Sequence, residues 1–122
     1  MPAATLTAQD LQQFTGSENW YRHGMNRDIL YTDGAQYVAE TGGAYWLLDE
    51  IALANKFERA VRLEEFQVWT LTRNADDHGA LLTCGDGNGS TVYSKAIEFT
   101  DFPLPTVTLW CEAGTIYLPS EH

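Results

Sequence analysis

The sequence has little positive charge. Only 7 of its 122 residues are Lys or Arg, against 17 Asp and Glu, which gives a formal net charge of −10. Binding to nucleic-acid phosphates needs a basic surface, so direct contact with DNA or RNA is disfavoured. Anionic membranes are disfavoured for the same reason. The acidic excess instead favours solubility and attraction to basic partners.

Long apolar runs are also missing. No stretch of about 18 apolar residues occurs, which is the length that a membrane-spanning helix needs. The chain begins without the basic segment and apolar core of a signal peptide. There are only two cysteines, Cys84 and Cys111. Without a secretion signal we expect both thiols to be free and buried, and the protein to be cytoplasmic.

Motifs for metals and cofactors are absent from the sequence. The three histidines, His23, His78 and His122, lack the spacing of metal ligands, and there is no Cys-x-x-Cys. No Gly-x-Ser-x-Gly, Walker or dinucleotide-binding fingerprint occurs either. We therefore predict no metal, no cofactor and no identifiable catalytic residue.

A glycine-rich segment after Asp86 resembles the start of a calcium-binding loop. An EF-hand would place Gly at its sixth position and Glu at its twelfth. Here those positions hold Thr91 and Ile97. The segment is better interpreted as the tight turn of a β-hairpin.

The material for a folded core is present. Hydrophobic residues make up 44% of the chain and aromatic residues 12%, a content that disordered chains lack. The length is typical of one domain, and no linker or internal repeat divides it. We predict a single domain over residues 1–122.

Two helices are predicted from capping and periodicity. Thr7 and Asp10 have the spacing of a capping box, which indicates a short helix over about residues 8–14. Leu47, Leu48 and Ile51 follow at helical intervals, which indicates one main helix over about residues 44–58.

The rest of the chain has the pattern of strands. Asp33 and Gly34 are typical of a tight turn, and they lie between β-favouring segments at 29–32 and 35–39, so a hairpin is predicted there. Further alternating segments lie at 66–72, 80–84, 91–99, 106–111 and 115–118, separated by short turns. The predicted fold class is α+β: an antiparallel, meander-like sheet packed with one main helix.

The densest group of function-bearing residue types lies in a predicted loop over residues 17–27. It consists of Trp20, Tyr21, Arg22 and His23. Aromatic and cationic residues together are typical of recognition surfaces. The alternative is structural, with the aromatic residues closing one end of the core and the arginine paired with an acid.

His23 would need an orienting carboxylate to act as a general base. Asp28, Asp33 and Asp49 are the alternatives, and the sequence does not choose among them. The candidate surface accordingly comprises Trp20 to His23 together with Asp33 and Asp49.

The acidic residues are spread over the chain, with one asymmetry. From residue 96 to residue 122 there is no Lys or Arg. The acids in this region are Glu98, Asp101, Glu112 and Glu121. A one-sided array of carboxylates is what a DNA-mimicking inhibitor would need, so this function is kept as a third hypothesis.

Several segments resemble an uncharacterised family of small bacterial proteins found in plasmid and phage-like contexts. The segments span residues 14–23, 31–34, 44–51, 65–69, 86–89 and 98–103. The resemblance extends over nearly the whole chain and implies no activity, cofactor or catalytic residue. It favours a protein that binds another protein, including an inhibitor of host defence.

Our leading hypothesis is therefore a non-enzymatic protein-binding or accessory module with an exposed aromatic and acidic surface. The second hypothesis is a small enzyme or ligand-binding protein with a pocket near Trp20 to His23, backed by Asp33 or Asp49. Whether the protein is an enzyme stays open, with the balance against it. Formation of a homodimer through the aromatic-rich sheet also stays open.

Overall fold

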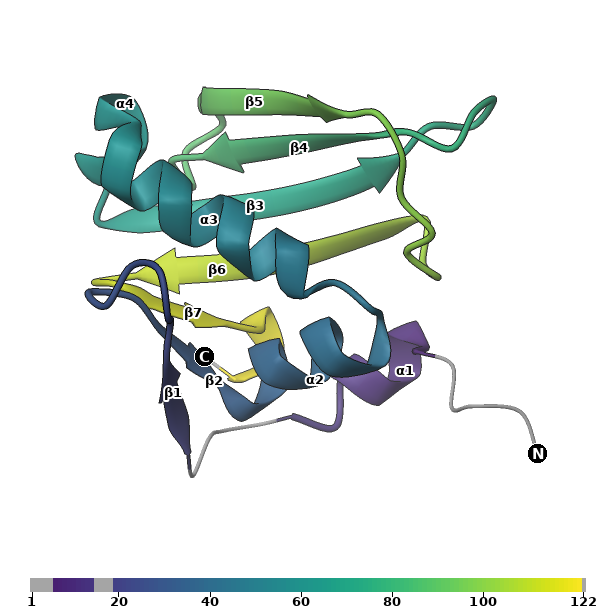
Figure 1. Ribbon diagram of the computed structural model, residues 1–122, viewed down its shortest axis with the longest axis horizontal. Helices are drawn as coiled ribbons and strands as arrows, with labels where there is room; N and C mark the ends of the chain where they lie inside the picture. Colours follow the sequence, from purple (N-terminus) through teal and green to yellow (C-terminus); the bar gives the residue numbers. More distant parts are fainter. Residues whose placement is uncertain (1–5, 15–18, 122) are drawn as a thin grey trace.

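The computed structural model describes residues 6–14 and 19–121. Within them, seven strands form one mixed, mostly antiparallel sheet in the order β1-β2-β7-β6-β3-β4-β5 (Figure 1). The strands are β1 (Trp20–Arg22), β2 (Leu30–Thr32), β3 (Phe66–Arg73), β4 (Ala80–Gly85), β5 (Thr91–Ile97), β6 (Thr106–Glu112) and β7 (Thr115–Tyr117). The helices are α1 (Ala8–Leu11), α2 (Asp33–Thr41), α3 (Tyr45–Phe57) and α4 (Arg59–Arg62), with a 3₁₀ turn η1 (Pro119–Glu121). The predicted α+β class is confirmed.

The predicted strands from residue 66 onward are confirmed, and their order adds two features. β3 pairs with both β4 and β6, so β6 lies beside β3 rather than beside the strand that precedes it in the chain. β2 pairs with β7 in parallel, with Leu30 opposite Thr115 and Tyr31 opposite Ile116. This long-range pairing brings the segment around Trp20 next to the end of the chain.

The predicted hairpin at Asp33 and Gly34 is wrong, because these residues begin helix α2. Thr32 caps the helix by accepting a hydrogen bond from the Ala35 amide at 3.3 Å. The buried residues Ala35, Val38 and Ala39 then follow at helical spacing. A β-carbon at Gly34 would lie 2.3 Å from Glu121 Oε1. The glycine is therefore explained by the close approach of Glu121 to the helix and not by a turn.

The main helix is confirmed as α3, which buries Leu47, Leu48 and Ile51. With α2, the fold has two substantial helices where one was predicted. The short N-terminal helix is present over Ala8–Leu11, and the capping box between Thr7 and Asp10 has both of its hydrogen bonds. The predicted loop at 17–27 contains the edge strand β1, which is too short for a periodic pattern, while residues 17 and 18 lie outside the described part.

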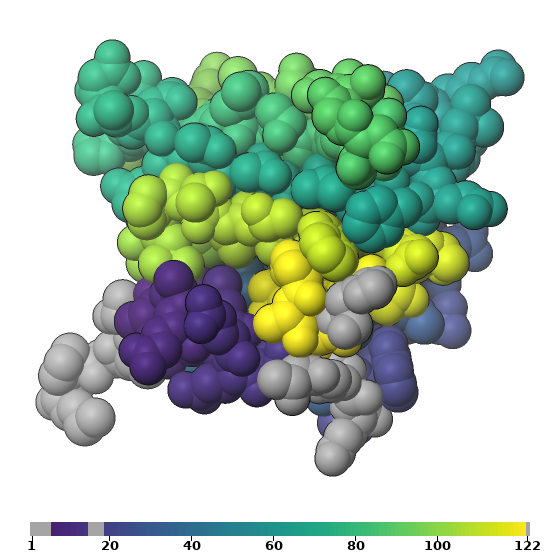
Figure 2. Space-filling view, turned by 180° about the vertical axis from the view of Figure 1, so that it is seen from behind, coloured from purple at the N-terminus to yellow at the C-terminus, as the bar shows by residue number. Residues whose placement is uncertain are grey.

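The helices α2 and α3 cover one face of the sheet (Figure 1), and the hydrophobic core lies between the helices and the sheet. The central strands alternate between buried and half-exposed residues, because successive side chains point to opposite faces. Seen from behind, the other face shows β3 to β6 without α2 or α3 across it (Figure 2). We call it the open face; the chain's C-terminal turn lies at its lower part.

Candidate binding site

Strand β1 divides the predicted cluster between the two faces of the sheet. Trp20 and Arg22 lie on one side of the strand, and Tyr21 lies on the other, followed by His23. Tyr21 and His23 contact the helices, whereas Trp20 lies on the open face. The four consecutive residues therefore do not form a single surface.

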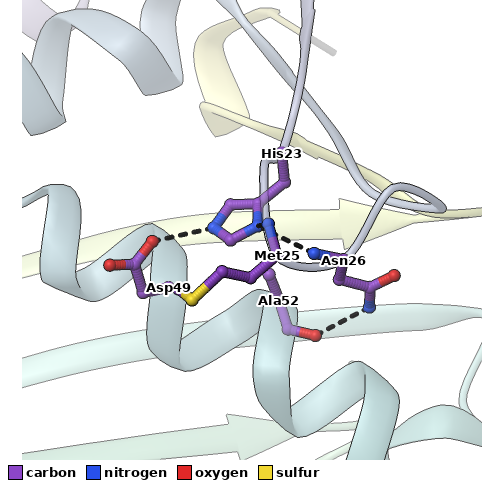
Figure 3. Close-up of polar contacts among 5 residues, drawn as sticks. All are labelled: His23, Met25, Asn26, Asp49 and Ala52. Atoms are coloured by element: carbon purple, nitrogen blue, oxygen red, sulfur yellow. Dashed lines mark hydrogen bonds and ion pairs between the residues drawn. The ribbon is translucent and has the colours of Figure 1, made fainter.

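His23 is buried, with 5% of its surface exposed, and every polar atom of its ring has a partner (Figure 3). Nε2 lies 2.8 Å from Asp49 Oδ1 on helix α3. Nδ1 accepts hydrogen bonds from the backbone amides of Met25 at 3.1 Å and Asn26 at 3.2 Å. Asn26 continues the network by donating to the Ala52 carbonyl at 2.8 Å. Of the three alternatives for the carboxylate, the structure selects Asp49.

These contacts indicate which tautomer the imidazole adopts. Because Nδ1 accepts from two amides, its lone pair is occupied and the ring proton belongs on Nε2, where it is donated to Asp49. A general base needs a free ring nitrogen within reach of its substrate. His23 and Asp49 therefore anchor the loop after β1 to helix α3, and they do not have the geometry of a catalytic pair.

Asp33 forms a separate cluster at the start of α2. Its Oδ1 accepts a hydrogen bond from the Tyr21 hydroxyl at 3.0 Å, and its Oδ2 accepts from the Asn19 amide at 3.2 Å. The hydrogen bond to Asp33, together with burial, raises the pKa of Tyr21 above its ordinary value. The Tyr21 ring stacks on Tyr31 with the centroids 5.5 Å apart. This cluster fastens β1 to the helix layer.

A cleft of about 400 Å³ opens beside Trp20. It lies where β1, β2, the β6–β7 hairpin and η1 meet. Its lining residues are Trp20, Thr32, Glu112, Ala113, Thr115, Tyr117 and Glu121. Trp20 is 57% exposed, which is unusual for the largest apolar side chain. Arg22 does not line this cleft; its guanidinium donates to the Arg27 carbonyl.

The two glutamates of the cleft differ in what they contact. Glu112 is exposed, and its Oε1 accepts a hydrogen bond from the Tyr117 hydroxyl at 3.0 Å. Burial and this hydrogen bond raise the pKa of Tyr117 to about 12. Glu121 Oε1 instead accepts from the Thr32 hydroxyl and the Leu118 amide, both at 2.8 Å, and its Oε2 accepts from the Gly34 amide. Glu121 thus joins the end of the chain to helix α2.

Of the six predicted surface residues, only Trp20 lines the cleft. Sequence reasoning missed its other walls, since they come from a hairpin almost a hundred residues away. One signal was present: Glu112 and Tyr117 flank the Ala113–Gly114 turn at positions that place both on one face of a hairpin. The parallel pairing of β2 with β7 that brings this hairpin to Trp20 has no local sequence signal.

The two cysteines are free and buried, as predicted. Burial raises the pKa of both the Cys84 and Cys111 thiols to about 12. A nucleophilic cysteine needs the thiolate, which burial disfavours. Both residues therefore pack in the core between the sheet and the helices.

The described residues contain no group of three or more His, Cys, Asp or Glu side chains that could hold a metal ion. His122 lies outside them. The Asp86 carboxylate accepts hydrogen bonds from the amides of Asn88 at 2.8 Å and Ser90 at 3.2 Å, so it closes the hairpin turn between β4 and β5. No helix in the described ranges is long and apolar enough to cross a membrane.

The chain was also compared with known proteins. No curated protein matches it, and no solved structure matches it. A family model described as "Family of unknown function (DUF6876)" matches residues 5–122. The match covers nearly the whole sequence, including the strands that line the cleft and the helix α3 that holds the His23 network. The chain belongs to this family of unknown function.

Proposed function

We propose that the protein is a non-enzymatic protein-binding module whose contact site is the cleft beside Trp20. The observation that carries the proposal is the exposure of Trp20, 57%, on the wall of a cleft of about 400 Å³. Tryptophan is enriched among the residues that dominate binding energy at protein interfaces. Leaving so large an apolar side chain in water is unfavourable, and a partner that covers it removes this cost.

The chemistry of the described residues supports the non-enzymatic part of the proposal. The His23 ring has both nitrogens engaged by protein atoms. The two thiols are buried and protonated at neutral pH. Among the described residues that line the cleft, the polar side chains are carboxylates and hydroxyls. Such a set is suited to binding rather than to moving protons at neutral pH.

Location and origin belong to the same proposal. Two free, buried thiols are typical of proteins in a reducing compartment, which supports the cytoplasm. The family resemblance supports a bacterial protein of plasmid or phage-like context. The genes that neighbour members of the family would test this part directly, since plasmid or phage genes beside them would support the proposed origin.

The contact site is tested by comparing two single substitutions. Phe57, at the end of helix α3, is even more exposed than Trp20, at 71%, and does not line the cleft. We expect the wild-type protein and Phe57→Ala to retain the same host protein from a lysate, and Trp20→Ala to lose it. If all three retain the same proteins, the Trp20 cleft is not the contact site.

Self-association is the competing explanation for an exposed tryptophan. Each chain carries a formal charge of −10, so two copies repel each other at low ionic strength. We therefore expect a monomer in light scattering. A dimer that dissociates on Trp20→Ala would show that the cleft joins two copies, and would overturn the proposal of a different partner.

A further inference from the structure

The cleft beside Trp20 combines an aromatic wall with negative charge. Two carboxylates, Glu112 and Glu121, line it, and its described lining includes no Lys, Arg or His. The net charge of the chain adds to the negative potential at this surface. These carboxylates repel an anionic ligand and attract a cationic one.

Glu112 has the geometry to bind such a cation. Its Oε1 accepts from the Tyr117 hydroxyl, which holds the carboxylate at the wall of the cleft. Among the described residues its Oε2 has no hydrogen-bond donor, and the residue is exposed. Glu121, by contrast, already receives donors at both oxygens from Thr32, Leu118 and Gly34. Glu112 is therefore the acceptor, and Glu121 contributes charge.

The combination of Trp20 and Glu112 favours arginine over lysine as the ligand. Arginine is planar, stacks on aromatic rings and binds carboxylates through two parallel N–H groups. Lysine presents a compact, strongly hydrated charge that makes neither contact as well. Trp20 and Glu112 line the same cleft, and an indole together with a carboxylate suits the guanidinium group.

We infer that the cleft binds an arginine side chain of the partner protein, with the guanidinium between the indole of Trp20 and the carboxylate of Glu112. This inference rests on the proposed function and names the chemistry of the residue that the partner inserts. In a protein segment the backbone around the arginine is uncharged, so the guanidinium is the group that the two glutamates attract. The cleft thus selects a basic segment of a protein.

Binding is measured by NMR titration of the ¹⁵N-labelled protein with a blocked Gly-Arg-Gly peptide. For so small a ligand, a dissociation constant on the order of millimolar is expected. We expect saturable shifts of the Trp20 indole N–H and of the Ala113 and Thr115 amides. The same peptide with citrulline, an uncharged analogue of arginine, should bind about tenfold more weakly, since cation–π and ion-pair terms are lost. The affinity of the lysine peptide should lie between those of the arginine and citrulline peptides.

Substitutions test whether Trp20 and Glu112 are responsible for the NMR shifts. Trp20→Ala and Glu112→Gln should each weaken binding of the arginine peptide about threefold. Phe57→Ala should bind it as the wild-type protein does. The dispersion of the amide spectrum shows for each variant that the fold is retained.

The outcomes separate this inference from the proposed function. Equal shifts with the arginine and citrulline peptides, or no shift at millimolar concentrations, would overturn the arginine inference. If Trp20→Ala still loses its host protein in that case, the cleft remains the contact site and binds another chemistry. If the arginine peptide binds but Trp20→Ala retains the same host proteins as the wild type, the arginine inference is supported and the proposed function is wrong.

Discussion

His23 and Trp20 are three residues apart in the chain, and they have opposite environments. His23 lies on the helix side of the sheet against α3, with both ring nitrogens hydrogen-bonded, whereas Trp20 lies on the open face with more than half of its surface exposed. The difference arises from strand β1, whose successive side chains point to opposite faces. A group of residues that looks like one site in the sequence is, in the fold, one structural anchor and one contact surface.

The comparison also shows how to recognise each kind of residue. At His23 the protein supplies all the partners that the side chain can use, so nothing remains for a ligand. At Trp20 the protein supplies one wall of a cleft and leaves the ring in water. Substitution of His23 should therefore affect mainly stability, and substitution of Trp20 should affect mainly binding.

The largest effect on stability is expected from His23→Ala. This change removes the donor to Asp49 and the acceptor for the backbone N–H groups of Met25, which is partly buried, and Asn26, which is buried. We expect the free energy of unfolding to fall by about 2–4 kcal/mol, measured by urea denaturation. Trp20→Ala, the matched change on the exposed side, should lower it by no more than about 1 kcal/mol. Equal losses would contradict the division of roles between the two residues.

A second prediction divides the cleft itself. Glu121→Ala should lower the free energy of unfolding by about 2 kcal/mol, because Thr32, Leu118 and Gly34 all lose their acceptor at the start of α2. Glu112→Ala, on the same cleft, removes one partly exposed hydrogen bond and should cost about 1 kcal/mol or less. The comparison fails if Glu112→Ala is the more damaging of the two in urea.

A third prediction concerns alkaline pH. The pKa values of Tyr117, Cys84 and Cys111 are raised to about 12 in the folded protein, from ordinary values of 10.0 for the phenol and 9.0 for the thiols. Because folding raises these pKa values, the stability that they contribute is complete below about pH 9 and is lost as the pH rises toward 12. The free energy of unfolding, measured by urea denaturation followed by circular dichroism, should therefore be constant to about pH 9 and then decrease.

Single substitutions assign this alkaline transition. Tyr117→Phe removes the phenol and the hydrogen bond to Glu112, so it should reduce the pH dependence above pH 10, by about 1 kcal/mol. Cys111→Ala should reduce the part that begins nearer pH 9. A transition unchanged in both variants would mean that other groups titrate with unfolding.

Much of the fold could be predicted because its signals are local. The main helix and the strands β3, β4 and β6 follow from periodicity, since each buries one side in a regular pattern. The error at Asp33 and Gly34 has a physical cause. Asp-Gly favours a turn in isolation, but Thr32 caps a helix there, and Glu121 packs closely against the glycine at the second residue of that helix. A contact from the far end of the chain overrode the local preference.

The candidate site could be predicted only in part. Trp20 was included because an aromatic residue among polar neighbours indicates recognition, and Asp49 was one of three alternatives for His23. Glu112 and Tyr117 were missed as site residues, since the parallel pairing of β2 and β7 that brings them to Trp20 joins segments far apart in sequence. Such pairings depend on the packing of the whole sheet and not on any short pattern.

The smallest predicted effect lies at Ala113, on the cleft wall. Ala113 has a φ of 50° and Gly114 one of 84°, so the β6–β7 hairpin has a two-residue turn with both φ values positive. Such turns favour Asn or Gly, since other residues are strained in the left-handed region. Asparagine tolerates this conformation, so we expect Ala113→Asn to raise the free energy of unfolding by about 0.5–1 kcal/mol in urea, and Ala113→Val to lower it.

The same substitution sharpens the comparison between stability and binding. Ala113 lines the cleft, and the larger asparagine side chain narrows it. Ala113→Asn should therefore bind the arginine peptide more weakly although the variant is more stable. His23→Ala, by contrast, should lower stability and leave binding at the cleft unchanged. A strained residue at a contact surface is retained where the relaxed alternative interferes with the ligand. If Ala113→Asn gains stability and binds the peptide as well as the wild-type protein does, the strain of this turn has no connection with the cleft.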